Sequence, residues 1–274
     1  MCSLASKPLS TAQVERYQQD GVLFPVPVLT GDYARQLSTR YVDFQNQAKD
    51  QFGSGQRFKV HLLATWLYDI VSAAPLLDAV EQILGPDILC WSTDFFAKPA
   101  HTPGFVSLHQ DSTYAGLEPA DGVLNAWVAF TPTSPANGCL RVVRGSHRLG
   151  QLAHANTYGE NNMLFFGQQA ELDYRDDDVL DVCLQPGQAS FHHMQVVHGS
   201  GPNNSDGPRI GMVIRYMRPD VKQQGPRDSA TLLRGHASDH FDLEPAPKAD
   251  FDATAIAAFR DAITRPSGLG DNPV

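Results

Sequence analysis

Basic residues, cysteines and long apolar runs are all scarce in this sequence, and each scarcity argues against a class of partner or location. Lysine and arginine number 21 against 30 aspartate and glutamate residues, which gives a formal net charge of −9, and no basic run is present. Nucleic acid and anionic membrane surfaces are therefore not expected partners. Polar residues interrupt the apolar stretches within about ten positions, far short of the ~20 residues that a membrane span requires.

The four cysteines do not form the paired spacing of a disulfide framework. Cys2, Cys90, Cys139 and Cys183 lie far apart in the sequence. The first residues, 1–8, lack the apolar core of a signal peptide. Both observations favour reduced thiols in a cytoplasmic protein.

The remaining composition is that of an ordinary folded protein. Hydrophobic residues make up 42% and charged residues 19% of the 274 residues, which is enough for a sizeable core. We expect a single domain, 1–274, with a helical part over about 10–86, a β core over about 88–219, and a C-terminal lid and helix over about 220–264. The expected partner is a small-molecule substrate, and the expected state is a monomer or a homodimer.

The first third of the chain predicts helices. Three are expected: one between the capping residue Ser10 and Gly21, one from Thr30 to about Lys49, and one over about 74–84. Segment 22–28 is expected to be extended, and its two prolines suit the edge of a sheet. Segment 51–60 is expected to be a loop.

From Ile88 on, the pattern changes to short β-like runs that are separated by turn-forming residues. Six such runs are present: 88–97, 105–111, 125–131, 140–143, 188–194 and 209–217. This spacing predicts a β-sandwich or a jelly-roll barrel. The loop-rich insert at about 150–185 is expected to overhang the barrel mouth, segment 222–225 to act as a flexible lid, and a last helix to form near 253–263.

A histidine and a carboxylate stand one residue apart at the end of the second β-like run. In an extended strand His109 and Asp111 point to the same face, so they can bind one metal ion. Imidazole with carboxylate suits a redox-capable ion such as Fe(II) better than a closed zinc site. A third ligand is needed, and His198 is preferred because a turn-rich segment follows it. The competing His192 and His193 are interpreted as core or supporting residues.

An arginine follows the third histidine by eleven positions and opens an apolar strand. Arg209 could be a surface residue, but an arginine inside a barrel needs an anionic partner. Its planar fork would pair with the carboxylate of a co-substrate. Strand alternation places Arg215 on the same face, where an inward position and a rim salt bridge are equally consistent with the pattern.

These motifs together resemble the phytanoyl-CoA dioxygenase family of Fe(II)/2-oxoglutarate-dependent oxygenases, over roughly residues 10–220. The resemblance rests on Leu108-His109-Gln110-Asp111, on Trp127, on the segment Asn137 to His147, and on the block from His198 to Arg209. One departure is Arg144, where relatives commonly carry proline.

The resemblance implies a mainly β fold with flanking helices, built on a double-stranded β-helix of the jelly-roll, cupin-like type. It further implies a role for each matching residue: His109, Asp111 and His198 as iron ligands, Arg209 and Ser200 as the site of the distal carboxylate of 2-oxoglutarate, and Trp127 and Ser92 as walls of the co-substrate pocket. The implied reaction consumes O2 and converts 2-oxoglutarate to succinate and CO2 while a substrate C–H bond is hydroxylated or otherwise oxidised.

The substrate is expected to be a small polar metabolite, and one candidate feature is an amine. Asp94 shares a strand face with Ser92, so an inward Asp94 would need a cation from the protein or from the substrate. Asp94 and Arg215 could also pair with each other. Two other functions stay open: a halogenase on the same fold, which the presence of Asp111 disfavours, and a non-catalytic cupin-like binding protein.

Overall fold

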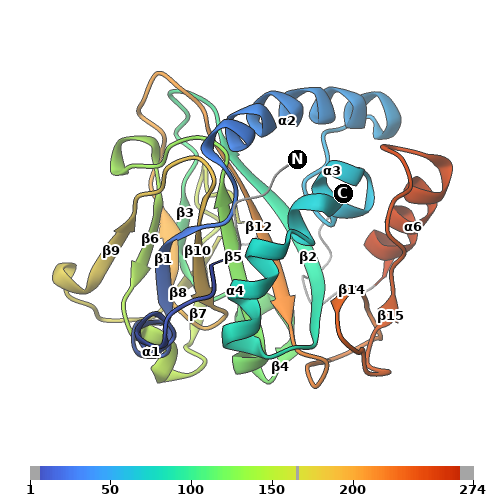
Figure 1. Cartoon of the computed structure of the whole chain (residues 1–274). Coiled ribbons are helices and arrows are strands. Elements are labelled where there is room, and N and C mark those ends of the chain that lie inside the picture. Colours follow the sequence, from blue (N-terminus) through green and yellow to red (C-terminus); the bar gives the residue numbers. More distant parts are fainter. Residues whose placement is uncertain (1–6, 165–166, 266–274) are drawn as a thin grey trace.

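Two β-sheets form the centre of the computed structural model, which describes residues 7–164 and 167–265 (Figure 1). The larger sheet has the order β1 (Val22–Pro27), β10 (Gln188–His193), β5 (Val123–Ala129), β12 (Arg209–Met217), β2 (Ile88–Lys98), β14 (Ser229–Arg234) and β15 (Asp242–Leu243). The smaller sheet has the order β3 (Val106–His109), β11 (His198–Ser200), β6 (Leu140–Val143) and β9 (Val179–Val182). Two short pairs complete the strands: β13 (Lys222–Gln223) with β4 (Leu117–Glu118), and β7 (His154–Asn156) with β8 (Gln168–Ala170).

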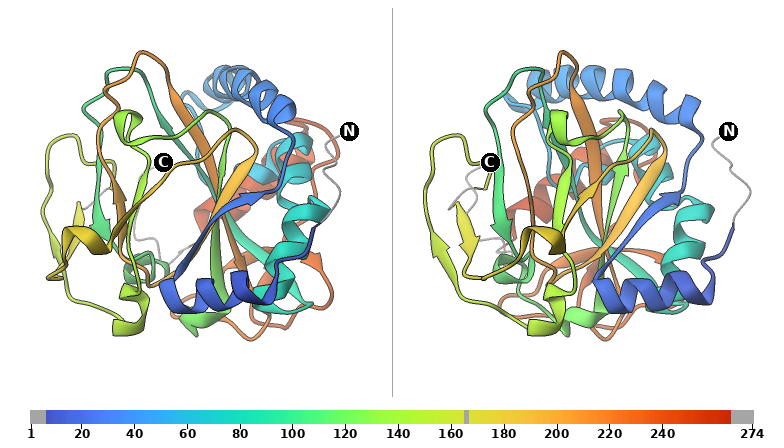
Figure 2. Two further views of the ribbon diagram at one scale, coloured as in Figure 1. Left: turned by 60° about the vertical axis from the view of Figure 1, so that its left-hand side comes forward. Right: turned by 90° about the vertical axis from the view of Figure 1, so that its left-hand side faces the viewer.

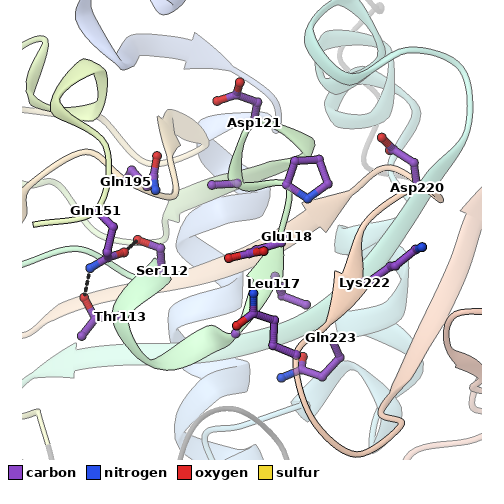
Figure 3. A pocket seen from close by; sticks show the side chains of 14 residues that line it. Ser112, Thr113, Leu117, Glu118, Asp121, Gln151, Gln195, Asp220, Lys222 and Gln223 are labelled. Atoms are coloured by element: carbon purple, nitrogen blue, oxygen red, sulfur yellow. Dashed lines mark hydrogen bonds between the residues drawn. The ribbon is translucent and has the colours of Figure 1, made fainter.

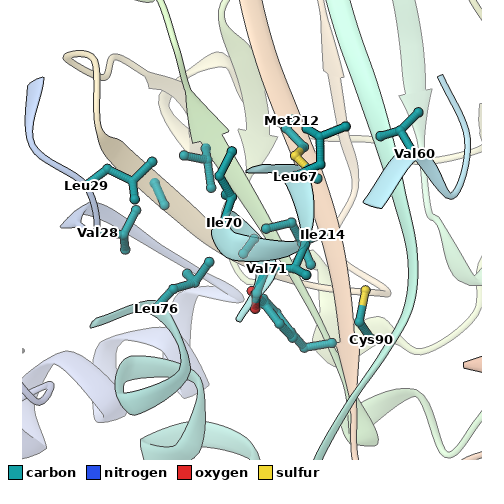
Figure 4. Packing of buried hydrophobic residues seen from close by; sticks show 14 of the residues in the cluster. Val28, Leu29, Val60, Leu67, Ile70, Val71, Leu76, Cys90, Met212 and Ile214 are labelled. Carbon is teal, nitrogen blue, oxygen red and sulfur yellow. The ribbon is translucent and has the colours of Figure 1, made fainter. Parts of the chain in front are cut away.

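Helices cover the outer face of the larger sheet. The α-helices are α1 (Thr11–Asp20), α2 (Gly31–Phe52), α3 (Thr65–Val71), α4 (Ala74–Leu84), α5 (Ser112–Ala115) and α6 (Ala253–Thr264). Short 3-10 turns are η1 (Val60–Leu62), η2 (Ala120–Gly122), η3 (Pro135–Asn137), η4 (Ser146–Leu149) and η5 (Asp176–Asp178). Figure 4 shows how Leu67 and Ile70 of α3 and Leu76 of α4 lie over Met212 and Ile214 of β12. This packing fixes which face of each strand looks outward.

The opposite face of the larger sheet packs on the smaller sheet. Trp127 and Val213 of the larger sheet join Val142 and Val182 of the smaller one in a buried cluster. Side chains alternate along a strand, so the neighbours of Trp127 and Val213 face the helices while these two face the barrel interior. Residues an even number of positions from them on the same strand, such as Arg209, Arg215 and Asn125, therefore point into the same interior.

The insert between β6 and β9 lies against the smaller sheet rather than free of it. The segment with β7 and β8 lies on the side away from α2 and α4 (Figure 2). Leu152, Ala170 and Leu172 of the insert pack against Val143 of β6 and against Val197, which directly precedes β11. The insert thus closes the outer face of the strands that carry the candidate metal ligands.

Most of the elements that the sequence predicted are present, with small shifts at their ends. Ser10 caps α1 with Gly21 at its end, Thr30 caps α2, and all six β-like runs are strands. Helix α3 was missed because it has seven residues and no capping side chain. The expected lid segment is tied down by the β13–β4 pair and by a hydrogen bond from the Gln224 N–H to Gly116 O. The movement of this segment as a lid stays a prediction. So does the description of 1–274 as a single domain.

A buried ionic cluster joins the helical part to the C-terminal segment. The Lys59 ammonium lies 2.6 Å from Glu244 Oε1 and 3.8 Å from Asp228 Oδ1, and all three side chains are nearly inaccessible to solvent. His61 Nε2 lies 3.6 Å from the other oxygen of Glu244. Burial alone would raise the pKa of Glu244, but Lys59 and His61 hold it well below its usual range. The cluster therefore depends on every member being present.

Replacing Lys59 with Met is expected to lower the free energy of unfolding by about 3–5 kcal/mol, because it leaves the Glu244 carboxylate buried without its main cation. The matched control is Arg227→Met, which removes a half-exposed ion pair with Asp242 and should cost no more than about 1 kcal/mol. Urea denaturation of both variants measures the difference. Equal losses would show that the buried cluster does not stabilise the fold.

Candidate metal centre and anion pocket

Two neighbouring strands of the smaller sheet bring the three predicted metal ligands together. In the antiparallel pair of β3 and β11, His109 stands directly opposite His198, and Asp111 follows β3 by two residues. Asp111 Oδ1 lies 3.1 Å from His109 Nε2 and 3.7 Å from His198 Nε2. The three ligand atoms all lie within 4.8 Å of one another, and all three residues are buried. This is a donor set that one divalent ion could bind.

Backbone carbonyls orient both imidazole rings. His109 Nδ1 lies 2.9 Å from Ser107 O, and His198 Nδ1 lies 3.0 Å from Val196 O. A proton on Nδ1 that is donated to a carbonyl leaves the Nε2 lone pair free for a metal. Burial and the neighbouring His109 lower the pKa of His198 to about 4. His198 is therefore neutral at pH 7, as a metal ligand must be.

The carboxylate of Asp111 is held on both oxygens. Its Oδ2 accepts a hydrogen bond of 2.7 Å from the Asn125 amide and lies 3.7 Å from Arg215 Nε. The Tyr114 hydroxyl donates a hydrogen bond to Oδ1, the oxygen that faces the histidines. Burial raises the pKa of Asp111, but the positive charges of His198, when protonated, and of Arg215 outweigh it and hold the pKa well below its usual range. The group stays ionised.

The two competing histidines point to opposite sides of β10. His192 faces the interior, and its ring centroid lies 5.0 Å from that of His198, although no partner for its buried Nδ1 is present among the described residues. His193 faces outward and lies 2.9 Å from Asp121. Of the three candidates, His198 is the one that joins His109 and Asp111. Its role as a metal ligand, like that of the other two, stays a prediction.

Arg209 is a buried cation without an anion. Its side chain is 2% exposed, and among the described residues its Nε and Nη2 have no hydrogen-bond partner. The guanidinium carbon lies 5.3 Å from the centre of the Trp127 ring. Burial lowers the pKa of Arg209 to about 10, so the group is still charged at pH 7. A Cβ at Gly211 would lie 2.0 Å from the Trp127 ring, so only glycine leaves room for the indole beside Arg209.

One cavity connects Arg209 with the three candidate ligands. It is lined by Phe96, Val106, His109, Asp111, Trp127, Leu140, His192, His198, Gly199, Ser200, Arg209, Val213 and Arg215. Ser200 and Trp127, which the resemblance assigns to the co-substrate pocket, thus line the same cavity as the three candidate ligands; their role stays a prediction. Ser92 does not line this cavity; its hydroxyl accepts a hydrogen bond of 3.2 Å from Arg215 Nη1.

Asp94 and Arg215, the tentative substrate residues, pair with each other. Arg215 Nη1 lies 2.5 Å from Asp94 Oδ2, and both side chains are almost entirely buried. Burial raises the pKa of Asp94 despite the nearby Arg215. The cation that Asp94 requires is therefore supplied by the protein, which was one of the two alternatives for this strand.

Several residues of the site were missed by sequence reasoning. Asn125 stands two residues before Trp127 and therefore on the same strand face, which is a signal that could have found it. Tyr114 follows Asp111 at helical spacing. Lys98 stands opposite Arg209 in the β2–β12 pair, and only the register between the two strands reveals it.

A second, wider pocket is lined in part by residues of α5. Its lining includes Ser112, Thr113, Glu118, Asp121 and Gln151, and its volume is about 1010 Å³ (Figure 3). The Gln151 side chain is held by the hydroxyls of Ser112 and Thr113. None of the predicted site residues lines this pocket.

Comparison with known proteins decides the family. A model of the family described as phytanoyl-CoA dioxygenase matches residues 7–211. The chain belongs to this family.

Curated members of the phytanoyl-CoA dioxygenase family match part of the chain at moderate identity. A probable phytanoyl-CoA dioxygenase of Caenorhabditis elegans is 29% identical over 187 residues, which cover 64% of this chain and 59% of that protein. The peroxisomal phytanoyl-CoA dioxygenase of Homo sapiens is 30% identical over 160 residues, or 56% and 46% of the two chains. The match thus spans about half the length of these relatives.

Solved structures match almost the whole chain. A non-haem monooxygenase, ThoJ in its apo form, has a TM-score of 0.84 at 36% identity and covers 92% of this chain and 95% of its own. CytC3 with Fe(II) and α-ketoglutarate has a TM-score of 0.65 at 18% identity, covering 90% and 98%, and this likeness concerns the fold alone. The predicted double-stranded β-helix fold is confirmed. Among the described residues, no helix is long and apolar enough to cross a membrane.

We expect the site formed by His109, Asp111 and His198 to bind one divalent ion per chain. Changing His109, Asp111 or His198 to Ala should each weaken binding strongly, because two remaining ligands cannot fix the ion. Anaerobic titration with Fe(II), monitored by calorimetry, measures this. His193→Ala is the control, since its ring points away from the cavity. Normal binding by His198→Ala together with lost binding by His193→Ala would mean that the distal ligand is misassigned.

Proposed function

We propose that the protein is a non-haem Fe(II)/2-oxoglutarate-dependent dioxygenase that hydroxylates an unactivated C–H bond of a small polar metabolite. The observation that carries this proposal is Arg209, a buried cation that has no anionic partner among the described residues and lines the same cavity as His109, Asp111 and His198. A metal site alone would fit many enzymes. A metal site that shares its cavity with an unpaired arginine fits a co-substrate that binds the metal at one end and carries a carboxylate at the other.

The residues present fit both groups. His109, Asp111 and His198 would hold Fe(II) through two neutral imidazoles and one ionised carboxylate, which leaves positions open for 2-oxoglutarate and O2. Arg209 and Ser200 would bind the distal carboxylate, since the two unpartnered guanidinium nitrogens match a carboxylate in geometry. When bound, iron and 2-oxoglutarate supply the oxidising chemistry, with decarboxylation to succinate and CO2.

The protein's own residues set the geometry of the reaction. Asn125 donates to Oδ2 of Asp111 and Arg215 Nε lies 3.7 Å from it, while Oδ1 accepts from Tyr114 and faces His109 and His198. These contacts would hold the carboxylate in place for the ion. Trp127 and Val213 provide an apolar wall that excludes water from the cavity. The similarity to ThoJ, which is described as a non-haem monooxygenase and has been solved with nickel, supports an oxygenase.

The alternatives are weaker on specific grounds. A halogenase on this fold needs room for a halide where the metal carboxylate stands, and here Asp111 fills that place with four partners around it. A non-catalytic binding protein has no need of three convergent metal donors beside an unpaired arginine.

The proposed substrate stays small and polar, whereas the argument for an amine is weakened. The cavity offers polar groups at His192 and Arg215 beside the apolar Phe96 and Leu140. Because Asp94 already has a cationic partner in Arg215, it does not require one from the substrate.

Replacing Arg209 with Ala should raise the 2-oxoglutarate concentration needed for half-maximal turnover by about thirtyfold or more, because a buried charge-assisted pair is worth about 2–5 kcal/mol when one partner is lost. Iron affinity should stay nearly the same. The control is Arg141→Ala, whose half-exposed ion pair with Asp181 lies outside the cavity. An unchanged 2-oxoglutarate requirement in Arg209→Ala would refute the assignment.

A metabolite library can be screened for compounds that stimulate succinate release, and we expect the active compounds to be polar. Mass spectrometry should show that each product has gained one oxygen atom, also when chloride is present. Asp94→Asn and Arg215→Ala should change the ranking of these substrates, because both disturb the ion pair beside the cavity. A neutral apolar compound as best substrate, or unchanged selectivity in both variants, would contradict the substrate proposal. A chlorinated product would favour the halogenase.

A further inference from the structure

Two buried cations lie side by side at one end of the cavity. Lys98 ends β2 and Arg209 begins β12, and the register of these antiparallel strands places them directly opposite each other. Side chains of such a pair share a face of the sheet. Lys98 is 0% and Arg209 2% exposed, yet within residues 7–164 and 167–265 neither has a carboxylate in ion-pair contact. Burying two like charges without an anion is costly, so the arrangement calls for a ligand that compensates it.

Lys98 donates all three of its hydrogen bonds to the end of β11 and the residue after it. Its ammonium donates to Ser200 Oγ at 2.7 Å and to Ser200 O at 3.4 Å, and also to Gly201 O. An ammonium group has three N–H donors, so none is left for direct contact with an anion. Any effect of Lys98 on a ligand must therefore pass through Ser200 or through its charge.

The Ser200 hydroxyl is left with one unused donor. Its oxygen accepts from Lys98, and among the described residues its own proton has no acceptor. Ser200 lines the same cavity as Arg209, whose Nε and Nη2 are also unpartnered. Three atoms with unused donors at one small space suit an anion with two oxygen atoms, such as a carboxylate.

We propose that Lys98 is a positioning residue of the co-substrate site: it holds the Ser200 hydroxyl toward the distal carboxylate that Arg209 binds, and it adds a second positive charge behind it. This inference rests on the proposed function, since it names the anion as the distal carboxylate of 2-oxoglutarate. It assigns a role to a lysine that contacts neither the metal ligands nor the ligand itself.

The charge of Lys98 makes binding depend on pH. Burial and the adjacent Arg209 lower the pKa of Lys98 to about 7, while Cys139 acts in the opposite direction. Burial raises the pKa of Cys139 to about 12, so that thiol stays neutral. Below pH 7 Lys98 is protonated and attracts the anion. Affinity should fall as the pH rises through 7, because the second charge is lost.

The test is calorimetric titration of the Ni(II)-loaded protein with 2-oxoglutarate between pH 6 and 8.5, which measures binding without turnover. Lys98→Met should weaken binding about tenfold or more at the acidic end, because the second positive charge and the fixed orientation of the Ser200 hydroxyl are both lost. It should also remove the pH dependence seen in the wild type. Lys49→Met, an exposed lysine on α2, is the matched control and should behave as wild type.

A double-mutant cycle tests the route through Ser200. If Lys98 acts in part by orienting the hydroxyl, the double variant should lose less affinity than the sum of the losses in Ser200→Ala and Lys98→Met. Additive losses would overturn the route through Ser200. Wild-type affinity for Lys98→Met, or a flat wild-type pH profile, would overturn the proposal itself.

Two comparisons keep the result interpretable. If Arg209→Ala binds 2-oxoglutarate normally, the proposed function fails; if Arg209→Ala binds weakly while Lys98→Met binds normally, only the role of Lys98 fails. Melting curves of each variant check folding, because Lys98 is buried. The wild-type pH profile needs no variant, so it decides the charge effect even when Lys98→Met does not fold.

Discussion

Burial of charge inside the barrel is the constraint on which the rest of this structure depends. At the metal end, Asp94, Arg215 and Asp111 form a chain of contacts that carries one net negative charge. At the other end, Arg209 is positive and Lys98 becomes positive below about pH 7, and within the described part of the chain neither has a carboxylate in ion-pair contact. Each end is incomplete as it stands, because buried charge requires compensation. A divalent cation at one end and a carboxylate at the other would compensate both, and 2-oxoglutarate bound to iron provides that combination.

The register of the strands creates these charge groupings. β12 runs between β5 and β2, so Arg215 stands opposite Asn125 on one side and Ser92 on the other. Six residues earlier on the same strand, Arg209 stands opposite Lys98. Their even spacing places both arginines on the inner face. One strand thus supplies the cation of each end, while the helices packed on its outer face hold the strand in place.

The sequence could predict those features that depend on the residues of one continuous segment. Capping residues located α1 and α2, alternation and turn residues located six strands, and the two-residue spacing brought out His109 and Asp111. What it could not predict depends on partners in other segments. The β2–β12 register decides whether Asp94 pairs with Arg215 or stays available to a substrate. The same register places Lys98 opposite Arg209. Short strands such as β9 and β11 have too few residues for a periodic pattern, so they too were found only in the fold.

The net charge of the metal end gives Asp111 a second effect, on anion binding, besides its proposed role as a metal ligand. Without that carboxylate, Asp94 and Arg215 would balance each other and the metal end would be neutral. A neutral end could still hold a metal through His109 and His198, but it would leave room for an external anion such as a halide. With Asp111 present, Asn125 donates to Oδ2 and Arg215 Nε lies 3.7 Å from it. The metal end then carries one more negative charge, so a bound divalent ion would attract a second anion less strongly. The ionised carboxylate therefore selects against a halide through electrostatics as well as through occupied space.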